Sequence, residues 1–574
     1  VLKAEYTKFR NMQGTFSKED VIPTYSGSSY ENRYYYSSGL YIFGEVELNN
    51  CEVEATNYKS EEAYWYSLNH ERRHAYRRYY VRAMEVAGTG NLTVKNSEVI
   101  CGNSEALYVS VVGGNVFVEK SSLTANQGAL ALRHGGTAVV SIKDSIISEN
   151  ANSTINSTGE SGFVFTGNTV SGGTYSISIG SLGSGEYTFT ENDFIGKGNY
   201  PVLLSLAYAT RERLDQISNH NTYTGYSQAN MPVLDGTLSG NCEVPVGKYA
   251  AHNLTVATGA NLVVEAGAEI YFTKDAGLTV SGEAELQGTE KAPVIISGFG
   301  DERAWEGAVN RTGYMGGVRV NEGGVLKAEY TKFRNMQGVF SKEDVVITGS
   351  TYEDRFYYSS GMYILGTAEL DGCEIYATNY KPAENYSYKK YTYGYQYAYR
   401  TYHTRAIEVV GKGNLILQDT TVTSGQGSAL LISTTAGTVD ITSSTLTSPQ
   451  SAFSLSHSGT ASVSITGCTL NGKASSVLAA SGEATTVIEN NTITCSTVAL
   501  KLNSYGGDFS VKGNTFLDCG HYPMYLFLGD LQTGEELTKI RDNVVVGGNT
   551  FYDVVLYGTP VNNFTIPKGR YFCE

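Results

Sequence analysis

The chain repeats a long stretch of its own sequence. Residues 1–14, VLKAEYTKFRNMQG, recur without change at 325–338, at an offset of 324 residues (325 − 1 = 324). The segment SSGLYIFGEVELNNCEV at 37–53 is matched by SSGMYILGTAELDGCEI at 359–375, at an offset of 322 (359 − 37 = 322). A period of this length exceeds one structural unit, so each copy must be built from smaller units.

A shorter period runs inside each copy. An apolar anchor residue followed by small polar residues recurs in steps of 24, 24, 23 and 24 residues in the first copy and 24, 24, 23 and 23 in the second. These anchors are Val94, Val118, Ile142, Phe165 and Phe189, and then Leu417, Ile441, Ile465, Ile488 and Val511. Alternating apolar and polar residues around each anchor, bounded by Gly, Asn and Ser, predict strands. Strands at a fixed pitch predict a solenoid in which each repeat of about 24 residues forms one coil.

Short asparagine-bearing steps recur where these strands end. They read GNTV at 167–170, ENDF at 191–194, ENNTI at 489–493, and GNTF at 513–516 and again at 548–551. With these steps the chain resembles bacterial right-handed parallel β-helix proteins of the pectate-lyase-like kind, which include surface and adhesin repeat proteins. The resemblance implies an all-β solenoid over most of the chain. It implies little about activity, because this fold serves lyases, hydrolases, phage spikes and adhesins alike.

The asparagines of these steps are candidates for the tight corners of the coils. Small polar side chains that stack from coil to coil can share hydrogen bonds along the axis. We expect such a ladder, with a structural role only, at Asn168, Asn192, Asn491, Asn514 and Asn549.

The repeats also predict the organisation of the chain. We expect a β-helix body at 1–252, connecting coils that open the next module at 253–324, and a second body at 325–574. Residues 254–298 resemble the opening coils of such helices. Because both chain ends fall inside a module, we expect the chain to be a piece of a longer tandem array.

Composition and cysteine usage narrow the partners and the chemistry. The formal net charge of −15 argues against nucleic acid as a main partner. No apolar run approaches the roughly 18–20 residues of a membrane span. No cysteine and histidine spacing suggests zinc, so no metal or cofactor is expected. Cys495 and Cys519 lie one coil apart, and buried free thiols are favoured over a disulfide between them.

Tyrosine is the unusual component, with 44 Tyr against 20 Phe and 2 Trp. Tyrosines concentrate at 30–41 and 352–363, and in two insertions at 57–83 and 379–406. Alternate tyrosines from Tyr391 to Tyr399 would share one face of an extended strand. Each insertion is too long for a corner, so we expect a projecting hairpin or a segment that lies along the flank of the coils.

Two interpretations of these insertions stay open. They could cover an apolar face of the solenoid, or they could be recognition loops, for which rigid aromatics with Ser, Asn, Gly and Arg are typical. The arginines could meet an acidic glycan, an anionic surface polymer or a further copy of the repeat, or could form a solvated face. The candidate ligand-binding residues are Tyr64, Trp65, Tyr66, Arg72, Arg73, Tyr76, Arg77, Tyr79, Tyr80, Tyr388, Tyr391, Tyr393, Tyr395, Tyr397, Tyr399 and Tyr402.

Evidence for an enzyme is weaker. Glu85 and Glu408 are equivalent in the two copies, and both are expected to be solvated, because they alternate with apolar strand residues. Asp301, Glu302 and Glu306 cluster by Trp305. Neither set forms a catalytic constellation, so no catalytic residue is assigned.

The sequence therefore favours a secreted or cell-surface structural and adhesive repeat protein. In this hypothesis a stiff rod presents Tyr/Arg-rich loops to glycans or other surface ligands. The alternatives are a building block of an extracellular filament, through chain–chain contacts, and a polysaccharide lyase or glycoside hydrolase.

Overall fold

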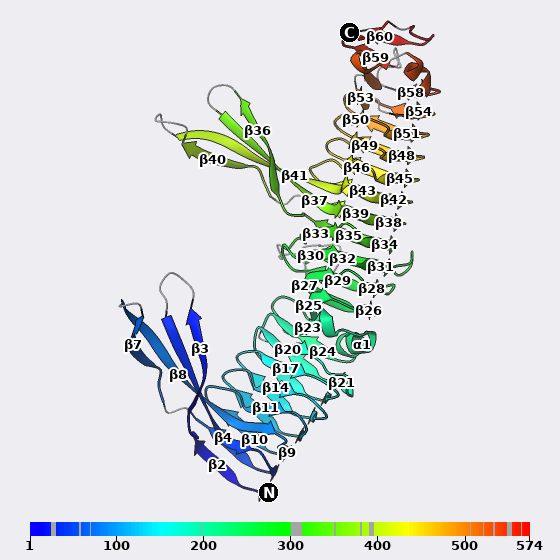
Figure 1. Cartoon of the computed structure of the whole chain (residues 1–574). Coiled ribbons are helices and arrows are strands. Elements are labelled where there is room, and N and C mark those ends of the chain that lie inside the picture. Colours follow the sequence, from blue (N-terminus) through cyan, green and yellow to red (C-terminus); the bar gives the residue numbers. More distant parts are fainter. Residues whose placement is uncertain are drawn as a thin grey trace. The chain divides into compact units, whose positions relative to one another are not determined.

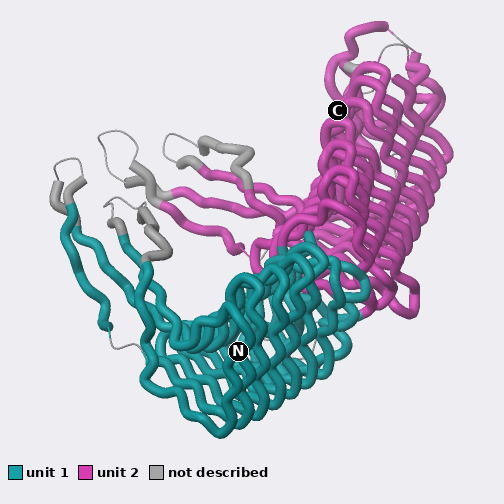
Figure 2. Tube along the Cα trace, turned by 60° about the horizontal axis from the view of Figure 1, so that its bottom comes forward, with its two compact units in different colours: residues 1–235, 247–250 teal, residues 236–246, 251–574 magenta. Residues whose placement is uncertain are grey.

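Strands dominate the computed structural model of the chain (Figure 1). The structure describes residues 1–24, 30–56, 59–68, 71–196, 198–299, 313–348, 352–378, 381–389, 395–504, 507–520, 522–531, 534–547, 554–563 and 565–573. Two compact units are present (Figure 2). Unit 1 comprises residues 1–235 and 247–250, and unit 2 comprises residues 236–246 and 251–574. The three-part division expected from the repeats stays a prediction.

Three stacks of parallel strands run along unit 1. The first is β1 (Leu2–Glu5), β5 (Glu45–Asn49), β9 (Asn91–Lys95), β12 (Asn115–Glu119), β15 (Val139–Lys143), β18 (Gly162–Thr166) and β21 (Tyr187–Thr190). The second is β2 (Lys8–Met12), β6 (Glu52–Ala55), β10 (Glu98–Cys101), β13 (Ser122–Ala125), β16 (Ile146–Glu149), β19 (Thr169–Ser171), β22 (Asp193–Ile195) and β24 (Thr222–Thr224). The third is β4 (Tyr30–Ile42), β8 (Glu71–Gly88), β11 (Leu107–Val111), β14 (Leu130–His134), β17 (Ser153–Ser157), β20 (Tyr175–Ser181), β23 (Tyr200–Ser205) and β25 (Val233–Leu238).

Unit 2 is built in the same way. Its first stack is β26 (Asn241–Val244), β28 (Asn261–Val264), β31 (Glu283–Gln287), β34 (Val325–Glu329), β38 (Thr367–Asp371), β42 (Asn414–Gln418), β45 (Thr438–Thr442), β48 (Ser462–Thr466), β51 (Thr485–Glu489), β54 (Phe509–Lys512) and β57 (Ile540–Arg541). Its second is β29 (Glu269–Phe272), β32 (Val294–Gly298), β35 (Thr331–Met336), β39 (Glu374–Ala377), β43 (Thr421–Ser424), β46 (Thr445–Ser448), β49 (Thr469–Gly472), β52 (Thr492–Cys495), β55 (Thr515–Leu517) and β58 (Val544–Val546). Its third is β27 (Lys248–Val256), β30 (Gly277–Val280), β33 (Gly317–Val320), β37 (Tyr352–Ile364), β41 (Tyr395–Gly411), β44 (Leu430–Thr434), β47 (Phe453–His457), β50 (Ser476–Ala480), β53 (Leu500–Ser504), β56 (Met524–Phe527), β59 (Val554–Tyr557) and β60 (Tyr571–Cys573).

The apolar anchors form the core of each unit. Val94 pairs with Val118, Val118 with Ile142, Ile142 with Phe165 and Phe165 with Phe189. The five anchors of the second copy, from Leu417 to Val511, are partners in the same way. All ten are buried. Inward residues therefore stack on the equivalent residue one coil away, at the strand spacing of about 4.8 Å. Each unit is a right-handed parallel β-helix, as the sequence predicts.

A polar ladder runs beside this core, as expected for the corner asparagines. The Asn168 side-chain amide donates to Asn192 Oδ1 at 3.0 Å, and that of Asn491 donates to Asn514 Oδ1 at 3.0 Å. The ladders extend one coil further, to Asn221 and Asn543, which the sequence analysis missed. In the other direction they continue through hydroxyl side chains, at Ser97, Ser121 and Ser145 in unit 1 and at Thr420 and Ser444 in unit 2. Asn549 lies outside the described residues.

Helical segments are few in the described chain. They are η1 (Leu206–Tyr208), α1 (Arg211–Asn219), η2 (Leu528–Asp530) and η3 (Glu535–Lys539). Helix α1 packs beside β21, the last strand of its stack, and the Gln216 side chain accepts the Phe189 N–H at 2.8 Å. The helix thus satisfies part of an otherwise open strand edge. None of the helices in the described chain has the length and apolar character needed to cross a bilayer.

The cysteines are free thiols. Seven of the eight are buried, and the exception is Cys573. Cys495 and Cys519 are both free and buried, which is the state that the sequence favoured.

Two hairpins interrupt the coils of each unit. In unit 1, β3 (Ser17–Thr24) pairs antiparallel with β4, and β7 (Glu62–Leu68) pairs antiparallel with β8. In unit 2, β36 (Ser341–Thr348) pairs with β37, and β40 (Glu384–Lys389) pairs with β41. The insertions at 57–83 and 379–406 are therefore hairpins. The hairpins at 17–42 and 341–364 were not anticipated.

Candidate ligand-binding site

Each pair of hairpins forms one four-stranded sheet that projects from the coils (Figure 1). Because β4 and β8 run parallel, the strand order of this sheet, here called wing 1, is β3-β4-β8-β7. Wing 2 has the equivalent order β36-β37-β41-β40. The inner strands β4, β8, β37 and β41 are long, because each runs from the wing into the third stack of its unit.

One face of wing 1, here called the packed face, is built around Tyr79. The Tyr79 ring stacks on Tyr35 at 5.2 Å between centroids and meets the edge of Phe16 at 5.2 Å. The Lys59 ammonium lies 4.0 Å from the Tyr79 ring centroid, and the Tyr79 hydroxyl donates to Glu62 at 2.8 Å. This hydrogen bond holds the pKa of the Glu62 carboxyl below its usual value. The packed face thus covers itself with its own side chains.

Wing 2 repeats the packed face residue for residue. Tyr402 stacks on Tyr357 at 5.2 Å, meets the edge of Phe340 at 5.1 Å and donates to Glu384 at 3.1 Å. The Lys381 ammonium lies 4.2 Å from the Tyr402 ring centroid.

The opposite face of wing 1, here called the open face, carries a row of aromatic rings. Trp65 lies 5.0 Å from the His74 ring, and His74 lies 4.9 Å from Tyr76. Tyr80 stacks against Tyr36 at 5.3 Å. The Trp65 side chain is 64% exposed, which is high for an indole. A large aromatic surface left in solvent is typical of an interaction site.

The open face of wing 2 has the same plan with different residues. His403 stacks on Tyr358 at 5.3 Å and lies 6.1 Å from Phe356. Tyr399 is 57% exposed and occupies the position equivalent to Tyr76. Positions of the open face therefore differ between the wings where those of the packed face are the same.

The structure distributes the sixteen candidate residues over both faces. By strand register Trp65, Tyr76, Tyr80 and Tyr399 belong to the open faces, and Tyr64, Tyr66, Arg77, Tyr79 and Tyr402 to the packed faces. Arg72, Arg73, Tyr388, Tyr395 and Tyr397 lie in β8, β40 and β41, but their side chains fall outside the described residues, as do Tyr391 and Tyr393 altogether.

Two candidates require a correction. Tyr79 and Tyr402 were expected to bind ligand, but they are only 6% and 4% exposed. Their rings are enclosed by the tyrosine, phenylalanine and lysine contacts of the packed face, so we assign them to the packing of the wings.

The base of each wing is held by a buried arginine. Arg82 lies 3.7 Å from the Tyr108 ring centroid and 4.6 Å from that of Tyr36, and it pairs with Glu85 at 3.1 Å. In wing 2, Arg405 pairs with Glu408 at 3.2 Å. The side chains of Glu85 and Glu408 are 12% and 14% exposed. The expectation that both glutamates are solvated is therefore wrong, because an arginine at the wing base covers each of them.

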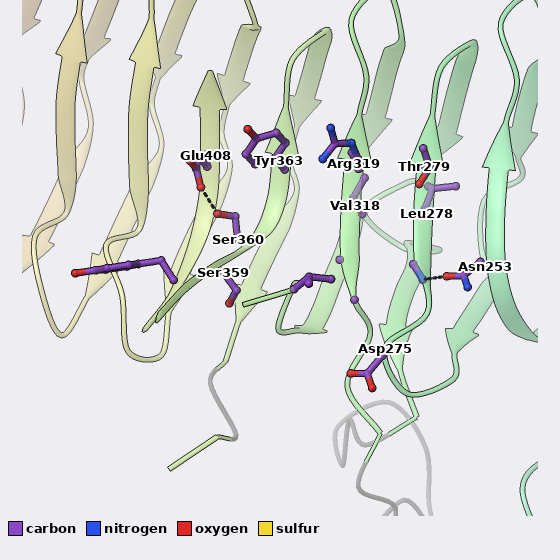
Figure 3. A pocket seen from close by; sticks show the side chains of 15 residues that line it. Asn253, Asp275, Leu278, Thr279, Val318, Arg319, Ser359, Ser360, Tyr363 and Glu408 are labelled. Carbon is purple, nitrogen blue, oxygen red and sulfur yellow. Dashed lines mark hydrogen bonds between the residues drawn. The ribbon is translucent and has the colours of Figure 1, made fainter. Parts of the chain in front are cut away.

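A hollow of ≈ 470 Å³ lies in unit 2 beside the base of wing 2 (Figure 3). Thr279, Arg319, Tyr363 and Glu408 line it as cross-strand partners on β30, β33, β37 and β41. The Arg319 guanidinium lies 5.0 Å from the Tyr363 ring centroid, and Glu408 accepts a hydrogen bond from Ser360. The sequence did not indicate this hollow, because its lining comes from segments about 130 residues apart in the chain.

The carboxylates of this hollow are too far apart for glycoside hydrolysis. Glu408 lies on β41 and Asp275 immediately precedes β30, which is three strands away. Three strand spacings amount to about 14 Å, whereas paired catalytic carboxylates are about 5–10 Å apart. Asp301, Glu302, Trp305 and Glu306 lie outside the described residues. Within the described ranges, no group of three or more His, Cys, Asp or Glu is placed to hold a metal ion.

Comparison with known families agrees with the fold. The family model for the right-handed β-helix region matches residues 429–566, which belong to the coils of unit 2 beyond wing 2. Searches of the curated proteins and of the solved structures found no match to this chain. The match supports a β-helix repeat protein and does not include the wings.

Proposed function

We propose that this chain is a structural and adhesive protein, secreted or held at a cell surface, that binds glycans through the open faces of its wings. The observation that carries the proposal is the exposed aromatic surface of a sheet that is built twice. Trp65 and Tyr399 present broad ring faces to solvent at equivalent edges of the two wings. Aromatic rings with a polar tip give contact area at a low cost in conformational entropy.

The β-helix supports this role mechanically. Each wing continues strands of the third stack, and an arginine braced by glutamate fixes its base. A site on such a rigid element is held in position before the ligand arrives, which lowers the entropic cost of binding. Two wings in one chain, and more in a tandem array, would turn weak sites into useful avidity.

A glycan array with matched variants tests the proposal. The variant Trp65→Ala with Tyr399→Ala removes one exposed ring from each open face. The control Phe117→Ala with Tyr208→Ala removes two exposed rings from the coils of unit 1. Removal of a central contact residue costs more than about 1 kcal/mol, so we expect binding to fall roughly tenfold or more in the wing variant alone. Equal binding by the wild type and both variants would refute recognition through the open faces.

The filament alternative also has support. Within the described chain, β7 pairs only with β8, so one edge of wing 1 has no strand partner. An open strand edge can add a strand from another chain. Sedimentation velocity over a hundredfold range of concentration tests this possibility. Concentration-dependent assembly would favour the filament, and a monomer throughout would exclude it.

A further inference from the structure

Each wing places two arginines directly opposite each other. Arg33 of β4 pairs with Arg77 of β8, and Arg355 of β37 pairs with Arg400 of β41. Like charges in directly opposed cross-strand positions destabilise a sheet. The two wings keep this arrangement at equivalent positions, so the fold bears the same cost twice.

A tyrosine ring draws each pair together. The Arg33 and Arg77 guanidiniums lie 5.0 and 4.7 Å from the Tyr64 ring centroid. Arg355 and Arg400 lie 4.9 and 4.6 Å from that of Tyr386. Cation–π attraction offsets part of the repulsion, at about 0.5–1 kcal/mol per contact at exposed sites. Both guanidiniums of a pair are therefore gathered over one ring.

A third cation and one carboxylate complete the cluster. Glu62 lies 3.8 Å from Arg77 and 3.6 Å from Lys59. Glu384 lies 3.8 Å from both Arg400 and Lys381. In each wing, one carboxylate thus stands among three cationic side chains.

Donor groups in the cluster remain available. The Arg77 and Arg400 side chains are 38% and 37% exposed. The buried Nε of each has no hydrogen-bond partner among the described residues. A guanidinium carries five N–H donors, so an arginine that also contacts a neighbour can still bind an anion.

We propose that each cluster is an anion site that takes the carboxylate or sulfate groups of an acidic polysaccharide. Paired guanidiniums match the planar oxygens of such groups through two parallel N–H···O bonds. The net charge of −15 gives the chain as a whole no general attraction for polyanions, so binding depends on this local pair. The inference rests on the proposed glycan-binding function and specifies the class of glycan. It places the acidic groups on the packed face, apart from the aromatic rings of the open face.

Retention of the full chain on immobilised polymers tests the proposal. The probes are dextran sulfate and polygalacturonate, with neutral dextran as the uncharged reference. The variant Arg77→Gln with Arg400→Gln removes one arginine from each cluster. The control Arg133→Gln with Arg541→Gln makes the same charge change on the coils. We expect at least tenfold weaker retention of the cluster variant on both acidic polymers, a steep loss with added salt, and no change for the control.

Several outcomes would overturn the proposal. Equal losses in the cluster variant and the control would indicate general electrostatics, and no loss in either would show that the clusters do not bind the polymers. Competition by free inorganic sulfate as strong as that by the polymer, per sulfate group, would indicate a small-anion site instead.

Two further measurements separate binding from folding and from the open faces. Because the arginine pairs repel, the cluster variant should melt no lower than wild type, and a lower melting temperature would indicate a structural role. Arg77→Lys with Arg400→Lys keeps the charge and loses the fork, so its retention should be intermediate. If acidic polymers are retained by the clusters but Trp65→Ala with Tyr399→Ala changes nothing on the array, the open-face proposal fails and this one stands.

Discussion

Glu149 is a carboxyl group enclosed within the β-helix of unit 1. It is 5% exposed and accepts hydrogen bonds from the Ala129 N–H at 2.7 Å, the Ser153 N–H at 3.2 Å and the Ser153 hydroxyl. Burial raises its pKa to about 8, because these hydrogen bonds only partly offset the loss of water. The folded protein therefore holds a proton that the unfolded chain releases above pH 4.5.

The pH dependence of stability follows from this proton. Between pH 4.5 and 8 the folded state binds more protons than the unfolded state, so the free energy of unfolding falls as pH rises. The contribution is fully present below pH 4.5 and is lost by about pH 8, with a size on the order of 4 kcal/mol. We expect the urea midpoint of wild type to fall across this range and that of Glu149→Gln to fall less. The exposed neighbour Glu98→Gln is the control, and a Glu149→Gln profile parallel to wild type would contradict the assignment.

Among the elements, the polar ladder has the clearest sequence signature. Asn168 is 1% exposed, accepts the Ser145 N–H at 3.0 Å and donates to the Ile142 carbonyl at 2.9 Å. The corner backbone groups of one coil are thus satisfied by the side chain of the next. Serine at position 145 serves the same column, since its hydroxyl accepts the Ser121 N–H at 3.2 Å.

Substitution in the ladder tests this account. Asn168→Ala leaves a buried N–H and a buried carbonyl without partners, so we expect a loss of about 2–4 kcal/mol. Asn168→Ser keeps an acceptor and should lose about half as much. Urea unfolding monitored by far-UV circular dichroism gives both values, and equal effects of the two substitutions would show that the hydrogen bonds contribute little.

At the scale of the whole molecule, one chain carries two wings with a common plan. The packed faces share their tyrosines, arginines, lysine and glutamate, whereas the open faces exchange Tyr76 for Tyr399, Tyr80 for His403 and Tyr34 for Phe356. Packing constrains a residue whose ring is enclosed, and it leaves a solvent-facing residue free to change. The two open faces should therefore differ in the ligand they prefer.

Single substitutions separate the two wings. We expect Trp65→Ala and Tyr399→Ala to weaken binding to different subsets of an array, each by several-fold, and the double variant to lose both. If the two single variants lost the same glycans in the same proportion, the wings would have one shared specificity.

The period of the sequence and the geometry of its side chains diverge at the insertions. The coils follow from alternating apolar residues at a fixed pitch, because an inward residue must meet its equivalent one strand spacing away. Asn221 and Asn543 escaped prediction because each follows the preceding ladder residue by 29 residues (221 − 192 = 29 and 543 − 514 = 29), where helical segments lengthen the coil. The composition of the tyrosine insertions indicated an exposed feature but gave no strand partners.

The sequence by itself thus determined the parallel β-helix, its anchors and most of its ladder, because these depend on contacts between equivalent positions of a regular repeat. Only the tertiary structure decided that two hairpins from distant segments join into one wing. It also decided which tyrosines are enclosed, as Tyr79 is, and which face solvent, as Tyr399 does. The physical reason is that strand pairing between β4 and β8 fixes which side chains share a face, and that pairing joins segments about 44 residues apart that no local pattern connects.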